Sequence, residues 1–233
     1  MRGTVVRLAT TQLAKLHALG VDIVQSYTTI GVVEEHNMAM TMLQMAGATP
    51  SPATMADGIL LIIDAQREYT DGLMPLTGVQ PAIEALAGLL EKARKAGAPI
   101  VHVRHQSKGK AFNPASSGYE IVAPLAPRPG ETIVDKGLPN AFAGTDLAKQ
   151  LAACGRKNLI IGGFMTHMCV SATVRSATDN GYMCTIAADT VATRDLPDAT
   201  GGPTISADAI NRITLAALSD RFAWIVPKAS QIG

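Results

Sequence analysis

Short apolar runs and longer amphipathic segments alternate along the chain from Gly58 onward. The apolar runs are continuous and rich in β-branched residues, which is typical of parallel strands buried on both faces. They predict strands at 59–63, 99–103, 132–134, 159–161, 183–187 and 223–226. Between them, apolar residues at helical spacing predict helices at 79–96, 146–154, 169–181 and 207–221. We therefore expect an α/β fold: a doubly wound, mostly parallel six-stranded sheet with helices on both faces.

The first 57 residues show a different pattern. Apolar residues recur at helical spacing from Val5 to Leu19, and a second helical pattern runs from about Thr28 to Ala46. The run Thr49-Pro50-Ser51-Pro52 then predicts a linker, because prolines end helices. We therefore expect a helical N-terminal extension at 1–57 and an α/β domain at 58–233. The second helix is expected to pack on that domain or on a neighbouring subunit through its methionines, which are Met38, Met40, Met42 and Met45.

Composition and charge argue against nucleic-acid and membrane partners. Lys and Arg total 20 and Asp and Glu total 19, so the net charge is +1 and no basic stretch predicts a nucleic-acid partner. No apolar run approaches the ~20 residues that cross a bilayer, and polar residues interrupt the N-terminal segment where a leader peptide has its apolar core. The sequence thus predicts a cytoplasmic protein with no membrane partner. Its three cysteines are too few and too far apart for a disulfide framework or a zinc site.

Reactive side chains follow three of the predicted strands. Asp64 follows the first strand, Lys136 the third and Cys169 the fourth. The carboxyl ends of parallel strands meet at one edge of an open sheet, so these groups are expected to converge there. Cys169 also opens a predicted helix, where unpaired N–H groups favour a thiolate and can lower a thiol pKa to roughly 3.5–7.5. Taken singly, each residue also fits a purely structural role: packing for the cysteine, a turn cap for the aspartate and an exposed loop position for the lysine.

Four stretches surround these strand ends: IDAQREYTDG (63–72), IVHVRH (100–105), ETIVDKGLPNAFAGTDL (131–147) and GGFMTHMCVSATVRSATDNGY (162–182). In this order and spacing they resemble the isochorismatase-like cysteine hydrolases, which include nicotinamidase and N-carbamoylsarcosine amidase. The resemblance runs from Gly58 to about Val226 and leaves out the first 57 residues. It implies a triad in which Cys169 is the nucleophile, Asp64 the general base and Lys136 the group that orients Asp64.

The resemblance further implies a cis peptide bond between Phe164 and Met165. The backbone N–H groups of Met165 and Cys169 would then form an oxyanion hole. With these parts, the expected reaction is hydrolysis of a small amide or related C–N bond through a thioester. A small-molecule substrate and a homo-oligomer, dimer or tetramer, are implied as partners.

The sequence differs from parts of this family at the residues that would bind a metal and at the residue that sets the reaction type. Relatives that hold a metal use an Asp-x-His pair with further histidines, whereas here His102 and His105 stand alone, so we expect no metal and no cofactor. True isochorismatases, which cleave a vinyl ether, usually lack the cysteine. An isochorismatase-type ether hydrolase and a non-catalytic member of the fold that serves assembly are the alternatives. His167 is left outside the catalytic group.

Four further residues are expected to line a substrate pocket. Tyr69 matches a pocket position in relatives, and Gln66 lies between it and Asp64. Phe112 and Phe142 fall in loops that could close over the site. The identity of the substrate does not follow from these residues.

Overall fold

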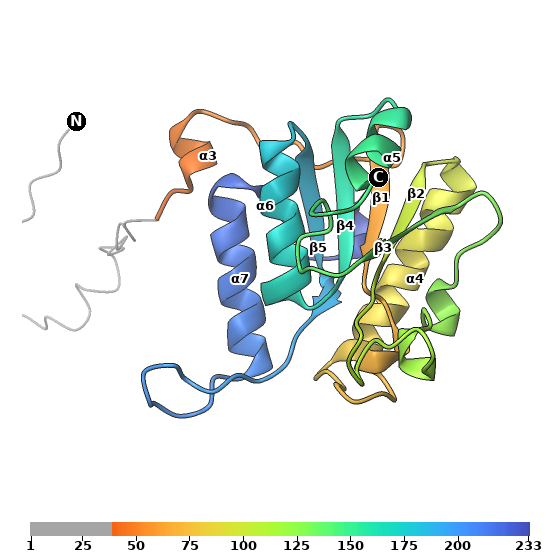
Figure 1. Cartoon of the computed structure of the whole chain (residues 1–233). Coiled ribbons are helices and arrows are strands. Elements are labelled where there is room, and N and C mark those ends of the chain that lie inside the picture. Colours follow the sequence, from red (N-terminus) through yellow and green to blue (C-terminus); the bar gives the residue numbers. More distant parts are fainter. Residues whose placement is uncertain (1–38) are drawn as a thin grey trace, which may run out of the picture. The chain divides into compact units, whose positions relative to one another are not determined.

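The computed structural model describes residues 39–233 of the chain. The helix predicted between Val5 and Leu19, and the part of the next one before Ala39, lie outside the described residues. Within residues 39–233 the structure is a single sheet flanked by helices (Figure 1).

The sheet has six strands in the order β3-β2-β1-β4-β5-β6, and every neighbouring pair is parallel. This confirms the predicted doubly wound α/β fold. The chain fills the sheet from its centre, because β1 lies between β2 on one side and β4 on the other. The strands are β1 (Gly58–Ile63), β2 (Ile100–His105), β3 (Thr132–Lys136), β4 (Asn158–Phe164), β5 (Met183–Ala192) and β6 (Ala223–Val226).

Two apolar clusters pack on opposite faces of this sheet. Side chains of β1 alternate between them: Leu60 and Ile62 pack in the cluster that contains the buried stripe of α4, and the flanking residues pack in the other. The second cluster contains buried residues of α5, α6 and α7, and α6 and α7 lie side by side over it (Figure 1). These helices are α4 (Val79–Ala96), α5 (Leu147–Ala153), α6 (Ser171–Asp179) and α7 (Ala207–Arg221).

The segment before β1 belongs to the same compact unit, Met40–Gly233. Ala53 and Met55 are buried in the core, and the Ala53 N–H donates a hydrogen bond to Thr185 Oγ1 on β5 (2.8 Å).

The predicted helix up to Ala46 is much shorter in the described residues. Only α3 (Met42–Met45) is helical there, because Thr41 has extended backbone and caps the helix with its side chain. Leu43 is its buried residue, and the Met42 N–H donates to Asp220 Oδ1 on α7 (2.8 Å). The methionines at 40, 42 and 45 are 53–69% exposed, so they do not pack on this domain.

Other element boundaries shift by a few residues. β3 extends through Lys136, β5 continues to Ala192, and two short 3₁₀ turns, Ser117–Tyr119 and Ala123–Leu125, interrupt the loop that follows β2. Among the described residues, none of the helices combines the length and the apolar character needed to cross a membrane.

Candidate active site

The carboxyl edge of the sheet brings Asp64, Lys136 and Cys169 together. Lys136 Nζ lies 2.7 Å from Asp64 Oδ2 and donates a hydrogen bond to Cys169 Sγ (3.3 Å). Asp64 and Lys136 are at most 1% exposed and Cys169 is 5% exposed, so their interactions are shielded from water. The three residues come from three separate parts of the chain, at the ends of β1 and β3 and just after β4.

Cys169 occupies a π-helical turn, Thr166–Val170, that joins β4 to α6. This turn can approach β1 because Gly163 has no side chain: a Cβ there would lie 2.0 Å from the carbonyl oxygen of Ile63. Its φ of +123° is also one that glycine adopts readily. Sequence pattern alone predicts an ordinary first helical turn and misses this wider one.

The structure corrects the expected electrostatics of the thiol. Burial and the negative charge of Asp64 raise the pKa of Cys169 to about 12, and the positive charge of Lys136 only partly opposes this. The helix-terminal effect is outweighed because Cys169 lies inside the turn, beside a buried carboxylate. Burial likewise raises the pKa of Asp64, against the nearby charge of Lys136. The free site therefore holds a protonated thiol next to a strengthened base.

Backbone conformation is unusual at two places around the site. Asp64 (φ 51°) and Phe112 (φ 53°) are the non-glycine residues with positive φ among residues 39–233. Such conformations cost free energy and persist where the surrounding structure imposes them. The turn at Asp64 is held by its own N–H, which donates to Val103 O (2.9 Å), and by its carbonyl, which accepts from the Gln66 N–H (2.8 Å).

The peptide bond between Phe164 and Met165 is cis, at the position implied by the family resemblance. The Met165 N–H has no hydrogen-bond acceptor among the described residues, although Met165 is buried. A buried, unpaired N–H beside a cysteine is a suitable donor for an oxyanion.

His105 is a member of this cluster that sequence reasoning leaves at the strand end. Its Nδ1 lies 3.2 Å from Lys136 Nζ. Burial and the charge of Lys136 lower the pKa of His105 to about 4, so the ring is neutral at pH 7 and Nδ1 accepts the hydrogen bond from Lys136. The sequence feature that could have indicated this role is the position of His105 at the end of the second strand. The structure places it in register with Lys136.

Two of the four predicted pocket residues form an aromatic wall. Tyr69 and Phe112 meet edge to face with ring centroids 5.2 Å apart, and Phe112 also contacts the ring of His105 (5.0 Å). Glu68 fixes this wall, because its buried carboxylate accepts from the Phe112 N–H (3.2 Å) and from the Leu73 N–H (2.7 Å).

The other two predicted pocket residues have different surroundings. The buried Gln66 amide donates to His105 O and Tyr119 O and accepts from the His105 N–H, so its polar atoms brace the backbone. Phe142 packs against Tyr182, with centroids 6.4 Å apart. Tyr182 follows the C-terminal end of α6, whereas Cys169 precedes its N-terminal end, so the structure does not bring Phe142 to the cysteine.

The other two histidines among residues 39–233 have structural partners. His102 is buried and its Nε2 lies 3.0 Å from Glu131 Oε2, while His167 forms a hydrogen bond with Thr193 Oγ1. Residues 39–233 contain no group of three or more His, Cys, Asp or Glu side chains arranged to share a metal ion.

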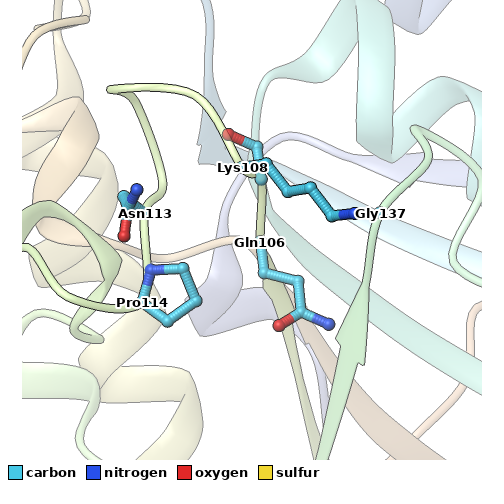
Figure 2. Close-up of a pocket in the computed structure, with 6 residues that line it drawn as sticks. Gln106, Lys108, Asn113, Pro114 and Gly137 are labelled. Carbon is cyan, nitrogen blue, oxygen red and sulfur yellow. The ribbon is translucent and has the colours of Figure 1, made fainter.

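A cavity of about 720 Å³ opens at the same edge of the sheet. Gln106 and Gly137 directly follow site residues at the ends of β2 and β3, and the loop that carries Phe112 supplies the opposite wall. Figure 2 shows the Lys108 side chain pointing across this cavity toward Gly137, with Asn113 and Pro114 on the other side. The lining residues are Gln106, Ser107, Lys108, Asn113, Pro114 and Gly137.

Comparison with known proteins gives consistent matches over this domain. The isochorismatase domain model matches residues 58–227. The chain is 36% identical to the secreted isochorismatase effector Isc1 of Verticillium dahliae, over 78% of this chain and 94% of that protein. It is 31% identical to a streptothricin hydrolase of Streptomyces noursei (87% and 79% covered) and 31% identical to the maleamate amidohydrolase of Pseudomonas putida (58% and 72%). The crystal structure of an isochorismatase from Pseudomonas putida KT2440 superposes with a TM-score of 0.79 at 41% identity, covering 82% of this chain and 98% of that one.

Proposed function

The chain belongs to the isochorismatase family, and from this premise we propose that it is a cysteine-dependent hydrolase of a small amide or related C–N bond. The observation that carries the proposal is the contact of Lys136 with both Asp64 and Cys169 at a buried strand edge. Burying an ion pair costs free energy, and a thiol that served only to pack the core would not need one beside it.

In the proposed reaction, Asp64 takes the proton of the Cys169 thiol as the sulfur attacks the carbonyl carbon. The raised pKa of Asp64 makes it a better base for this step, and Lys136 holds the carboxylate in place. The carbonyl electrons move to the oxygen, which the N–H groups of Met165 and Cys169 would stabilise by about 3–4 kcal/mol each.

Collapse of this intermediate breaks the C–N bond. The leaving nitrogen receives the proton from Asp64, and the acyl group stays on Cys169 as a thioester. A water molecule, deprotonated by Asp64, then attacks the thioester and releases the carboxylic acid with regeneration of the thiol. Two of the relatives reported above are named as a hydrolase of streptothricin and an amidohydrolase of maleamate, which supports chemistry of this class.

Substitution of the cysteines tests the proposal. With a panel of small amides and detection of released ammonia or amine, Cys169→Ala should lower turnover at least about a thousandfold. Cys154→Ala is the matched control and should retain activity, because Cys154 is a half-buried residue at the end of α5. Amide hydrolysis by Cys169→Ala at a rate near that of the wild type would refute the mechanism.

A second candidate is hydrolysis of a vinyl ether, favoured by the 36% identity to an isochorismatase effector. Pyruvate release from isochorismate separates the two functions. Ether hydrolysis that persists in Cys169→Ala, together with no amide hydrolysis by the wild type, would replace the first proposal with this one.

A further inference from the structure

The lining of the cavity beside the site carries one positive charge and no carboxylate. Four of its six lining residues are polar, and Lys108 is the one with a charge. The nearby Arg104 is neutralised by Asp135 (2.7 Å), whereas Lys108 has no ion-pair partner among the described residues. An unpaired ammonium in a concave site attracts anions, because the surrounding protein focuses its field.

The loop that carries Lys108 is held by its own hydrogen bonds. Ser107 Oγ donates to Ala111 O (2.6 Å) and accepts from the Gly109 N–H (3.1 Å). On the far side of the loop, Asn113 Nδ2 donates to Gly109 O (2.9 Å). These bonds occupy the polar side chains of Ser107 and Asn113, so the Lys108 ammonium and the Gln106 amide are the lining groups left to bind a ligand.

The loop is also tied to the reactive cluster. The Ser107 N–H donates to the carbonyl of Phe112 (3.0 Å), whose ring packs on His105. The Gln106 N–H donates to the carbonyl of Lys136 (2.8 Å). The backbone of the loop that carries Lys108 is therefore held close to residues that contact Cys169.

From this arrangement we infer that Lys108 is a specificity-determining residue that binds a carboxylate on the substrate, remote from the bond that is cleaved. One ammonium and one amide match the two oxygens of a carboxylate, whereas a phosphate dianion requires more donors. The inference rests on the proposed function and names its substrate class: a small amide acid rather than a neutral amide.

Binding without turnover provides the first test. Calorimetric titration of the full chain with maleate, succinate and glutarate, and with the corresponding diamides, compares anions with neutral ligands of similar shape. We expect each anion to bind about fivefold or more tightly than its diamide. Lys108→Met should remove this preference. Lys110→Met should keep it, because Lys110 is exposed on the same loop but does not line the cavity.

Turnover provides the second test. With maleamate and its neutral diamide as substrates, Lys108→Met should raise KM for maleamate about fivefold and leave kcat/KM for the diamide within twofold, while Lys108→Arg restores the preference. The inference is overturned if the wild type binds anions no better than diamides, or if Lys108→Met and Lys110→Met behave alike. Anion binding through Lys108 without any amide hydrolysis would instead overturn the proposed function alone.

Discussion

At the scale of single residues, the site depends on a lysine that is almost completely buried. Lys136 is 1% exposed, and its ammonium contacts Asp64 Oδ2, Cys169 Sγ and His105 Nδ1. The ammonium thus has one ion-pair partner and two hydrogen-bond partners, which compensates part of the cost of burying the charge. Without this cation, the buried carboxylate would have no opposite charge beside it.

Removal of the cation should therefore destabilise the fold as well as stop the reaction. We expect Lys136→Met to lower the free energy of unfolding at pH 7 by about 3–5 kcal/mol, because the charge of Asp64 is left buried and unpaired. The double variant Asp64→Asn/Lys136→Met should recover most of that loss in denaturant titrations. Equal stability of the single and double variants would show that the ion pair carries no such role.

The state of the thiol gives a second prediction at this scale. With its pKa raised to about 12, Cys169 should contribute no thiolate absorbance at 240 nm below about pH 9, measured as the difference between wild type and Cys169→Ala. Because the pKa of Cys169 is higher in the folded chain than in the unfolded chain, the unfolded chain loses the thiol proton at a lower pH. The contribution of Cys169 to stability is therefore complete below pH 9 and declines between about pH 9 and 12. A thiolate signal at pH 7 would contradict both expectations.

At the scale of elements, the position of the cysteine depends on how closely β4 passes β1. Gly163 allows this approach, because a Cβ at this position would overlap the carbonyl oxygen of Ile63. Any other residue would also have to adopt a φ of +123°, which L-residues rarely do. We expect Gly163→Ala to lower the free energy of unfolding by at least about 4 kcal/mol. Gly88→Ala on α4 is the matched control: its Cβ meets no atom within 4 Å, and alanine should stabilise the helix by about 0.5–1 kcal/mol.

The aromatic wall has its own anchor in Glu68. Glu68→Ala removes the acceptor for the Phe112 and Leu73 N–H groups, which should cost about 2–3 kcal/mol of stability and raise KM by releasing Phe112. Glu84→Ala, at an exposed position on α4, should change stability by less than about 0.5 kcal/mol. An unchanged KM in Glu68→Ala would show that the wall does not contact the substrate.

The element pattern was largely predictable from sequence, and the reasons differ between elements. The bounds of α4, α7 and β6 agree with the predicted ones. The apolar periodicity of α4 is strong and Gly97 ends that helix, while Pro227 follows β6. The π-helical turn at 166–170 and the positive φ at Phe112 were not predictable. Both are imposed by contacts with distant segments, through Gly163 against β1 and through Glu68 against the loop.

The same distinction applies to the site. Placement of Asp64, Lys136 and Cys169 at one edge follows from the strand order, which the alternation of strands and helices makes predictable. The raised pKa of Cys169, the part played by His105 and the bracing role of Gln66 depend on side-chain burial and register. Those properties arise only when the strands are assembled, so sequence spacing does not contain them.

At the scale of the whole molecule, α3 presents exposed methionines on a surface of the domain. Met40, Met42 and Met45 are 53%, 55% and 69% exposed, and methionine surfaces commonly bind other apolar surfaces. We predict that the N-terminal extension supports assembly of a dimer or tetramer. Deletion of residues 1–52 should lower the oligomeric state measured by light scattering and leave the residues of the site in place.

A shorter deletion locates the contact. Removal of residues 1–39 retains α3 and its methionines, so assembly that survives this deletion but not the longer one would assign the contact to α3. If both truncated chains keep the number of subunits of the full-length assembly, the extension has no role in assembly and this prediction is wrong.

The central position of β1 has a consequence for how activity is acquired. Asp64 directly follows β1. Lys136 reaches the site only after β2 has paired with β1 and β3 has paired with β2. Cys169 reaches it only after β4 has paired with the other side of β1. These contacts join segments far apart in the chain, which is the slow part of folding in parallel sheets. During refolding, Cys169 should therefore react with iodoacetamide as an ordinary thiol until both halves of the sheet have joined. Hydrolytic activity should appear in the same kinetic phase in which that labelling stops, so a newly made chain has no reactive centre until its topology is complete.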